Sequence, residues 1–261
     1  MKPSNNPDIA VAQEWLGELD AWEETHGLCG FDPFDVKQHP LVRAAQTHPL
    51  RRKFATGLCD LFPNTARRLL HIAPTENPKA HALFALGRLR LFQLTREERY
   101  LAKARAHLDW LRNHAAACEG LAWGYPFDIH AKGLDTPANT PVGVVTAIAG
   151  QAFLLAHEVT GDAAFLDDAQ RIAHFFLTVI PRMDQDTGVC FAYTPGDTRK
   201  VHNANLLTAE HLLAVWKRTD DAACLAAAEP AVAYTLSRQR DDRAWPYGEY
   251  PAGEPFEPEL L

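Results

Sequence analysis

A helical pattern that repeats about every 60 residues is the feature that most limits how this chain can fold. Three short connections mark the repeat: Leu94-Thr-Arg-Glu97, Val159-Thr-Gly-Asp162 and Arg218-Thr-Asp-Asp221. We expect the threonine in each connection to be the N-cap of the following helix, with Thr95 and Glu98 forming a capping box. Each repeated unit is therefore a helical hairpin that cannot bury its apolar face alone.

Apolar residues follow the helical period almost throughout, and long alternating stretches flanked by Asn-Gly or Asp-Gly turns are lacking. This pattern disfavours a β-sandwich and a βαβ fold. We expect about eight helices, at residues 8–26, 41–61, 77–94, 96–115, 140–159, 162–180, 203–218 and 220–239.

The later helices are of two alternating kinds. Helix 162–180 has one apolar stripe and one charged face, whereas helix 140–159 is apolar nearly all round and must be enclosed by other helices. Inner and outer helices of this kind predict an all-α fold, an α/α toroid made of about four hairpins. A linear helical solenoid is the alternative, but its repeats are usually shorter, about 34 to 47 residues.

We expect a single domain over residues 1–261, with a proline-rich tail at 246–261. The tail falls where a further inner helix would begin, and proline cannot build a helix interior. The ring is therefore expected to be incomplete. Its open edge would expose inner-helix surface that a second copy or a partner protein could cover.

The connections from each outer helix to the next inner helix are long and carry a second repeat. They read Trp123-Gly-Tyr-Pro-Phe-Asp128, Phe191-Ala-Tyr-Thr-Pro-Gly-Asp197 and Trp245-Pro-Tyr-Gly-Glu249, and Gly30-Phe-Asp-Pro-Phe-Asp35 is a looser relative. Each of the first three has an aromatic residue, a tyrosine two positions later and then a carboxylate. Because these loops join equivalent helix ends, we expect them on one rim of the ring, where long loops are often functional.

Aromatic rings and carboxylates on one rim are typical of sugar sites, because rings stack on sugar faces and acids bind hydroxyls. Paired carboxylates could also be the acid and base of glycoside chemistry. The alternative is that each Trp and Tyr packs over the top of its own hairpin.

The starts of the inner helices add positive charge to this rim, because helix N-termini offer free N–H groups. Basic side chains lie beside them in the sequence: Lys79, His81, His130, Lys132, Arg199, Lys200 and His202. This favours an anionic ligand such as a uronic acid or a phosphorylated sugar. The alternative is that these are surface lysines and capping histidines.

Composition excludes several other classes of protein. The formal charge of −7 disfavours nucleic acid and anionic membranes as partners. No apolar run reaches the 18 or so residues that span a bilayer. Five scattered cysteines without a CxxC pair indicate reduced thiols in a cytoplasmic protein. The twelve histidines form no HExxH motif, so we expect no metal and no cofactor.

Taken together, these segments resemble a bacterial α/α-toroid family associated with polysaccharide biosynthesis, which is related in architecture to six-hairpin glycosidases and sugar epimerases. The resemblance lies in Gly30–Asp35, Glu76-Asn-Pro-Lys-Ala80, Trp123–Asp128, Phe191–Asp197, Val201-His-Asn-Ala-Asn205 and Trp245–Glu249. It implies a role with surface or exported glycans, carried out in the cytoplasm. The family pattern continues into further helices, whereas this chain ends 12 residues after Glu249.

Our first hypothesis is a sugar-active enzyme with an acidic or oligosaccharide substrate. Proton transfer by Tyr or His would make it an epimerase, and two carboxylates would make it a hydrolase. The expected catalytic residues are Asp128, Glu249, His202 and Tyr193. The expected substrate-binding residues are Trp123, Tyr125, His130, Lys132, Asp32, Asp35, Asn77, Lys79, Asp197, Asn203, Asn205, Trp245 and Tyr247.

A second hypothesis is a non-catalytic glycan-binding or scaffold subunit of a polysaccharide-assembly complex, which the unclosed ring favours. A third, a terpene cyclase or prenyltransferase-like ring, is disfavoured because the sequence has neither a DxDD motif nor a DDxxD cluster.

Overall fold

The computed structural model describes residues 7–32, 35–46, 57, 60–131 and 134–256. The chain divides into two compact units, Met1–Asn77 and Pro78–Leu261, and each is described by itself. The single domain over 1–261 stays a prediction.

Among its described residues, the first unit holds one 20-residue helix, several short helices and one small strand pair. Its elements are α1 (Pro7–His26), β1 (Cys29–Gly30), α2 (Asp35–Gln38), α3 (Pro40–Gln46), α5 (Pro63–Leu69) and β2 (Thr75–Glu76), with β1 and β2 antiparallel. The helix predicted at 8–26 is confirmed as α1. Of the helix predicted at 41–61, α3 covers the start, and residues 47–56 and 58–59 lie outside the described residues. The pattern missed α2 and α5, which are too short to show helical periodicity.

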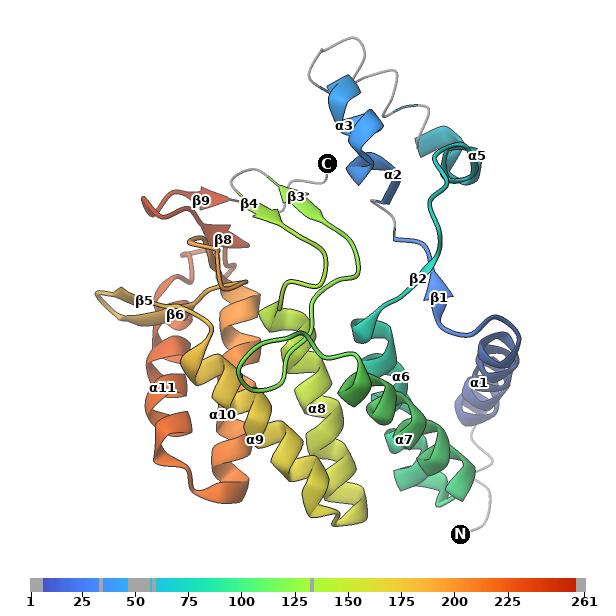
Figure 1. Cartoon of the computed structure of the whole chain (residues 1–261). Helices are drawn as coiled ribbons and strands as arrows, with labels where there is room; N and C mark the ends of the chain where they lie inside the picture. The colour runs from blue at the N-terminus through green and yellow to red at the C-terminus, as the bar shows by residue number, and fades with distance from the viewer. Residues whose placement is uncertain (1–6, 33–34, 47–56, 58–59, 132–133, 257–261) are drawn as a thin grey trace. The chain divides into compact units, whose positions relative to one another are not determined.

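The second unit consists of three helical hairpins within the described residues, where the sequence predicted about four for the chain. The hairpins are α6 (Pro78–Thr95) with α7 (Glu98–Asn113), α8 (Gly143–Thr160) with α9 (Ala163–Thr178), and α10 (His202–Thr219) with α11 (Ala222–Ser237). The inner helices contact one another in the order α6, α8, α10, and each outer helix packs on its own inner helix (Figure 1). This confirms the predicted alternation of inner and outer helices.

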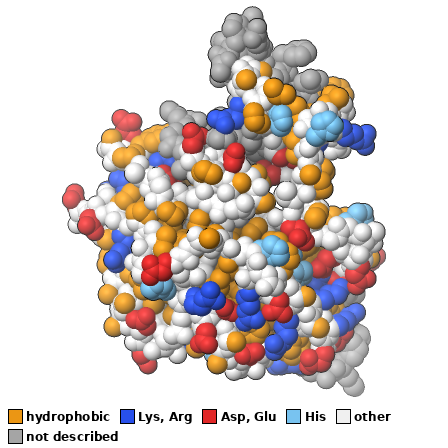
Figure 2. Space-filling model, in the orientation of Figure 1, with side chains coloured by type: hydrophobic (Ala, Val, Ile, Leu, Met, Phe, Trp, Pro, Cys, Tyr) orange, Lys and Arg blue, Asp and Glu red, His pale blue; other side chains and the backbone are white. Residues whose placement is uncertain are grey.

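The two kinds of helix differ in burial as their sequences predict. Inner helix α8 has the length and apolar composition of a membrane-spanning segment, but 67% of it is buried inside the protein. Its packing against α6, α9 and α10 is that of a core helix. The outer helices present a wet face, and on the side seen in Figure 2 acidic and basic side chains are interspersed over α7 and α9.

The repeated turn inside each hairpin has the same geometry three times, but its threonine has a different role from the one predicted. The hydroxyls of Thr95, Thr160 and Thr219 donate to carbonyls one turn earlier in the inner helix, at 2.9, 2.6 and 2.9 Å. Each hydroxyl also accepts from the N–H two residues later. The threonines therefore end the inner helices. The N-cap side chains of the second and third outer helices are Asp162 and Asp221.

Short strands occupy the loops at one end of the hairpins (Figure 1). They form the antiparallel pairs β3 (Ile129–Ala131) with β4 (Leu134–Thr136) and β5 (Arg182–Gln185) with β6 (Gly188–Phe191), and a sheet of β7 (Lys200–Val201), β8 (Gly248–Glu249) and β9 (Pro255–Phe256). With two to four residues each, they are too short for an alternating pattern to reveal. The tail over residues 246–256 contains no helix, as its prolines predict.

Candidate functional site

The second and third tyrosine loops return over the start of their own hairpin's inner helix. The N–H of Gly143, the first residue of α8, donates to the Tyr193 carbonyl at 2.9 Å. The N–H of His202, which begins α10, donates to the Tyr247 carbonyl at 3.1 Å. The equivalent first residue of α6 is Pro78, which has no N–H to satisfy. These bonds place the loops at the N-terminal ends of the inner helices, as the sequence predicted.

The first aromatic residue of each loop anchors the loop to its hairpin. Trp123 is fully buried and its indole N–H donates to the Leu111 carbonyl at 2.9 Å, so it has no free face for a sugar. Phe191 is buried as well. Trp245 is bonded in the same way to the Thr235 carbonyl at 2.8 Å but stays 39% exposed. The packing alternative is therefore correct for Trp123, and only Trp245 keeps an accessible ring.

The three loop tyrosines meet, although they are far apart in the sequence. Tyr193 shares a hydrogen bond with Tyr125 and also lies close to Tyr247. Burial raises the pKa of the Tyr193 hydroxyl above its ordinary range, and the two neighbouring tyrosines raise that pKa further. Tyr193 is thus a protonated hydroxyl at neutral pH, suited to hydrogen bonding and not to acting as a base.

An ion pair lies beside these tyrosines. Asp197 is buried and forms an ion pair with Arg199, with 3.1 Å between Arg199 Nη2 and Asp197 Oδ2. The Arg199 backbone N–H also donates to Asp197 Oδ1 at 2.9 Å. This carboxylate shapes its own loop.

Glu249 is the centre of a buried polar cluster. It lies on β8 opposite Lys200 of β7, and its Oε2 is 3.7 Å from the Lys200 ammonium. Tyr234 of α11 donates its hydroxyl to the same oxygen at 2.9 Å. The Arg238 guanidinium is 3.3 Å from Oε1, and the His202 ring is 3.7 Å from it. Three loop and helix segments thus converge on one carboxylate.

His202 stands apart in this cluster because its imidazole is buried without a hydrogen bond. Neither ring nitrogen has a hydrogen-bond partner among the described residues. Burial lowers the pKa of His202, and Arg238 and Lys200 lower that pKa further, while Glu249 opposes them. The imidazole is therefore neutral at pH 7 and can accept a proton.

The cluster can carry out acid–base chemistry next to an anion. A neutral imidazole beside a carboxylate can take up a proton, because Glu249 would stabilise the resulting imidazolium. Lys200 and Arg238 supply two positive charges against the single charge of Glu249, and Arg238 is one third exposed. The nearby Cys190 is no nucleophile, because burial raises the pKa of its thiol to about 12. Within the described ranges, no three His, Cys, Asp or Glu side chains gather to hold a metal ion.

Several predicted residues lie outside this cluster. Asp128 is exposed, and its Oδ1 accepts from the Ala138 N–H at 2.8 Å. Asn205 is fully buried and its amide is bonded to Phe191, Ala231 and Thr235, so it serves the fold. Asn203 is exposed in the first turn of α10, and Lys79 is half-buried in the first turn of α6.

The remaining predicted residues belong to other environments. Asp32, Asp35 and Asn77 are in the first unit, where Arg67 binds Asp35 at 2.9 Å. His81 is buried, with its ring stacked 3.7 Å from that of Trp110. Lys132 and the side chain of His130 lie outside the described residues.

Sequence reasoning missed Tyr234 and Arg238, which bind Glu249 from α11. The repeat contained a signal for them. The equivalent residues of the second hairpin are Phe175 and Val179, which are apolar. A tyrosine and an arginine one turn apart at these positions of the third hairpin are the departure from the repeat that marks them.

Comparisons with known proteins identify the architecture. No family model matches the sequence, and no curated protein matches it significantly. A D-mannose isomerase structure is similar with a TM-score of 0.53 and 13% identity, covering 68% of this chain and 46% of the isomerase. The fold is the α/α toroid.

Two further structures agree. A glycoside hydrolase family 76 mannosidase from Bacteroides thetaiotaomicron has a TM-score of 0.50 and 13% identity, covering 65% of this chain and 46% of the mannosidase. An endo-β-1,4-glucanase from Acetobacter xylinum has a TM-score of 0.50 and 12% identity, covering 66% and 53%. The chain thus spans about half the length of these toroids, which are of the six-hairpin glycosidase type. Membership of a polysaccharide-biosynthesis family stays a prediction.

Proposed function

We propose that this protein is a carbohydrate-active toroid that binds an anionic sugar at Glu249, Lys200 and Arg238 and moves a proton through His202. The single observation that carries the proposal is the neutral, buried imidazole of His202 beside a carboxylate and two cations. The fold supports it, since similar toroids are described as a mannose isomerase and glycoside hydrolases. A role in polysaccharide metabolism in the cytoplasm belongs to the same proposal.

The reaction is an epimerisation or isomerisation. His202 removes the proton from a sugar carbon next to a carbonyl or carboxyl group, and the electron pair of that bond moves onto the oxygen. Lys200 and Arg238 stabilise the negative oxygen, and Glu249 stabilises the imidazolium. In an isomerisation, the imidazolium of His202 returns the proton to the neighbouring carbon on the same face. In an epimerisation, the imidazolium releases its proton to solvent and water supplies a proton to the other face of the same carbon, so neither reaction needs an oxidant. Trp245 supplies an accessible ring for the sugar face.

A hydrolase is less well supported. It needs two carboxylates flanking one bond, and of the predicted pair only Glu249 belongs to the buried cluster, while Asp128 binds its own loop.

The non-catalytic glycan-binding subunit is the second candidate, and one observation favours it. Glu249 already has Tyr234, Arg238 and Lys200 around it, which is also how a purely structural carboxylate is held. Binding of a sugar without chemistry would identify this function.

A thermal-shift screen tests the binding step. We expect glucuronate, sugar phosphates or nucleotide sugars to raise Tm, because a ligand at about 100 times its Kd adds about 2.7 kcal/mol. Neutral glucose should give no shift. Arg238→Gln should remove the response, whereas Arg171→Gln, a matched arginine on α9, should keep it. A response to glucose equal to that to glucuronate would contradict the anionic site.

Deuterium uptake tests the chemical step. In D₂O, a sugar identified by the screen should gain carbon-bound deuterium with the wild-type protein. His202→Asn should abolish this exchange, and His174→Asn, at an exposed histidine of α9, should retain it. Binding without exchange would support the glycan-binding subunit. The absence of both binding and exchange would overturn the proposal.

A further inference from the structure

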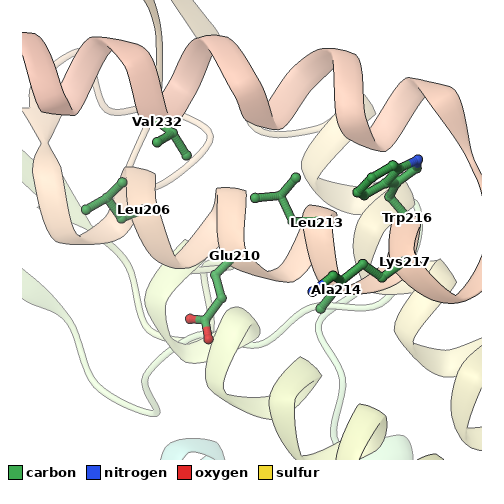
Figure 3. Close-up of a pocket in the computed structure, with 7 residues that line it drawn as sticks. All are labelled: Leu206, Glu210, Leu213, Ala214, Trp216, Lys217 and Val232. Atoms are coloured by element: carbon green, nitrogen blue, oxygen red, sulfur yellow. The ribbon is translucent and has the colours of Figure 1, made fainter.

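The third hairpin has an apolar groove on its side. The groove has a volume of about 520 Å³ and lies between α10 and α11, and Figure 3 shows Leu206 and Leu213 on one helix and Val232 on the other. Leu206 is 38% exposed. Glu210 and Lys217 are the charged side chains among its lining residues.

The internal repeat indicates what such a groove receives. Counting back one repeat, Leu206, Leu213 and Val232 correspond to Ala147, Leu154 and Ala173 of the second hairpin, and these three residues are buried. One further repeat back they correspond to Ala82, Leu89 and Leu108, which are fully buried. In the first two hairpins the following inner helix packs against this side, as α8 does on α6 and α10 on α8.

The groove is not the outer face of a capping repeat. Terminal repeats that face water carry polar side chains at such positions, because an exposed apolar face is poorly soluble. Here the three equivalent positions hold Leu, Leu and Val. The chemistry of this side is that of a surface which receives another inner helix.

At the opposite edge of the second unit, α6 exposes an apolar surface. On α6, Leu83 is 49% exposed and Gly87 is exposed, with no atom within 4 Å of where its Cβ would lie. Their equivalents, Ile148 and Ala152 on α8 and Leu207 and His211 on α10, are half-buried or buried. Within the second unit, α6 is therefore an inner helix with an uncovered edge, and α8 and α10 use the equivalent edge to pack against the preceding hairpin.

We propose that a second copy of this chain occupies the groove, with α6 of one copy packed against α10 and α11 of the other. Two such contacts related by a twofold axis form a closed dimer, because each copy then contributes the same pair of surfaces, its α6 edge and its groove. In this contact α6 of the second copy would pack on the groove as α8 packs on α6 and α10 packs on α8 within one copy.

The first test is the oligomeric state of the full chain by sedimentation equilibrium. We expect a dimer, and we expect Leu206→Glu and Leu83→Glu each to raise the dimer Kd at least about tenfold, because either glutamate would be buried without a partner. Leu69→Glu, at an exposed leucine of α5, should leave the Kd unchanged. Circular dichroism verifies that each variant folds. A monomeric wild type, or a dimer that both edge variants leave intact, would overturn the proposal.

The second test distinguishes this edge-to-edge pairing from a pairing of two grooves. The Leu206→Glu copy keeps an intact α6 edge, and the Leu83→Glu copy keeps an intact groove. Mixing them should give stronger association than either variant alone at the same concentration, because the mixed dimer keeps one intact α6-to-groove contact. A mixture that associates no more strongly than either variant alone would exclude the α6-to-groove contact.

Discussion

The first and third hairpins of the second unit follow the same sequence pattern but end in different chemistry. The loop after α7 reads Trp123-Gly-Tyr125 with Asp128 following, and the loop after α11 reads Trp245-Pro-Tyr247 with Glu249 following. The first loop buries its tryptophan and leaves its carboxylate exposed, whereas the last loop does the reverse.

The outer helix beside each loop explains the difference. At the end of α11, Tyr234 and Arg238 reach Glu249, and the antiparallel pairing of β7 with β8 brings Lys200 to it. The equivalent residues at the end of α7 are Trp110 and His114, whose rings stack 4.0 Å apart. The same loop motif thus becomes packing or a charged site according to its neighbours.

Replacing the two loop tryptophans should give the largest difference in stability between the two hairpins. Trp123→Ala should lower the free energy of unfolding by about 4 kcal/mol, because it empties a fully buried site and removes an indole hydrogen bond. Trp245→Ala should cost less than half as much, since its ring is already partly in water. Urea unfolding measures both, and equal losses would contradict the difference in burial.

Replacing the two loop carboxylates, Glu249 and Asp128, should give the next largest difference in stability. Glu249→Gln should destabilise by about 3 kcal/mol, because it leaves the Lys200 and Arg238 charges near a neutral side chain. Asp128→Asn should change stability by about 0.5 kcal/mol at most, since the amide oxygen can still accept from the Ala138 N–H. Matching losses in the same unfolding experiment would show that Asp128 has an equally structural role.

Acid should lower the free energy of unfolding through buried histidines in both the first and the third hairpin. Burial first, and then His107 and His114, lower the pKa of His81 from 6.5 to about 3, and burial lowers that of His202. The unfolded chain takes up a proton near pH 6.5 and the folded chain does not, so stability is complete above that pH and falls as pH decreases toward 3.

The slope can reach about 1.4 kcal/mol per pH unit for each such histidine. His81→Gln should flatten the decline of unfolding free energy measured between pH 6.5 and pH 5. His174→Gln, at an exposed histidine, is the control. An unchanged slope in His81→Gln would mean that this ring is protonated in the folded state.

The smallest expected effect is at the helix caps. Asp221 accepts from the Ala223 N–H at 3.0 Å at the start of α11, whereas Glu97 at the start of α7 makes no side-chain cap. Asp221→Ala should therefore cost about 1 kcal/mol. Glu97→Ala should cost about 0.5 kcal/mol or less in thermal unfolding. A larger loss for Glu97 would show that the turn is held by charge and not by capping.

Much of the fold could be predicted because helical periodicity and a repeated turn are local signals. The inner helix α8 and the outer helix α9 differ in their sequences as they differ in burial. The prediction that Thr160 caps α9 was wrong, because a threonine before a helix can either cap that helix or end the preceding one. Asp162, two residues later, is the N-cap of α9.

The site could be predicted only in part. The motif found Glu249 and His202, because they lie in the repeated loops. It could not exclude Trp123 or Asn205, since burial depends on which helix covers a loop. It also missed Tyr234 and Arg238, whose role depends on the fold bringing α11 beside β8.

The proposed function requires that the last loop, and not the first, binds an anionic sugar. A crystal of the full chain soaked in glucuronate tests it most directly. We predict density for the sugar carboxylate within hydrogen-bonding distance of Lys200 and Arg238, with the ring next to His202 and Trp245. Sugar density at the Trp123–Asp128 loop, or no ordered sugar at either loop, would contradict the claim.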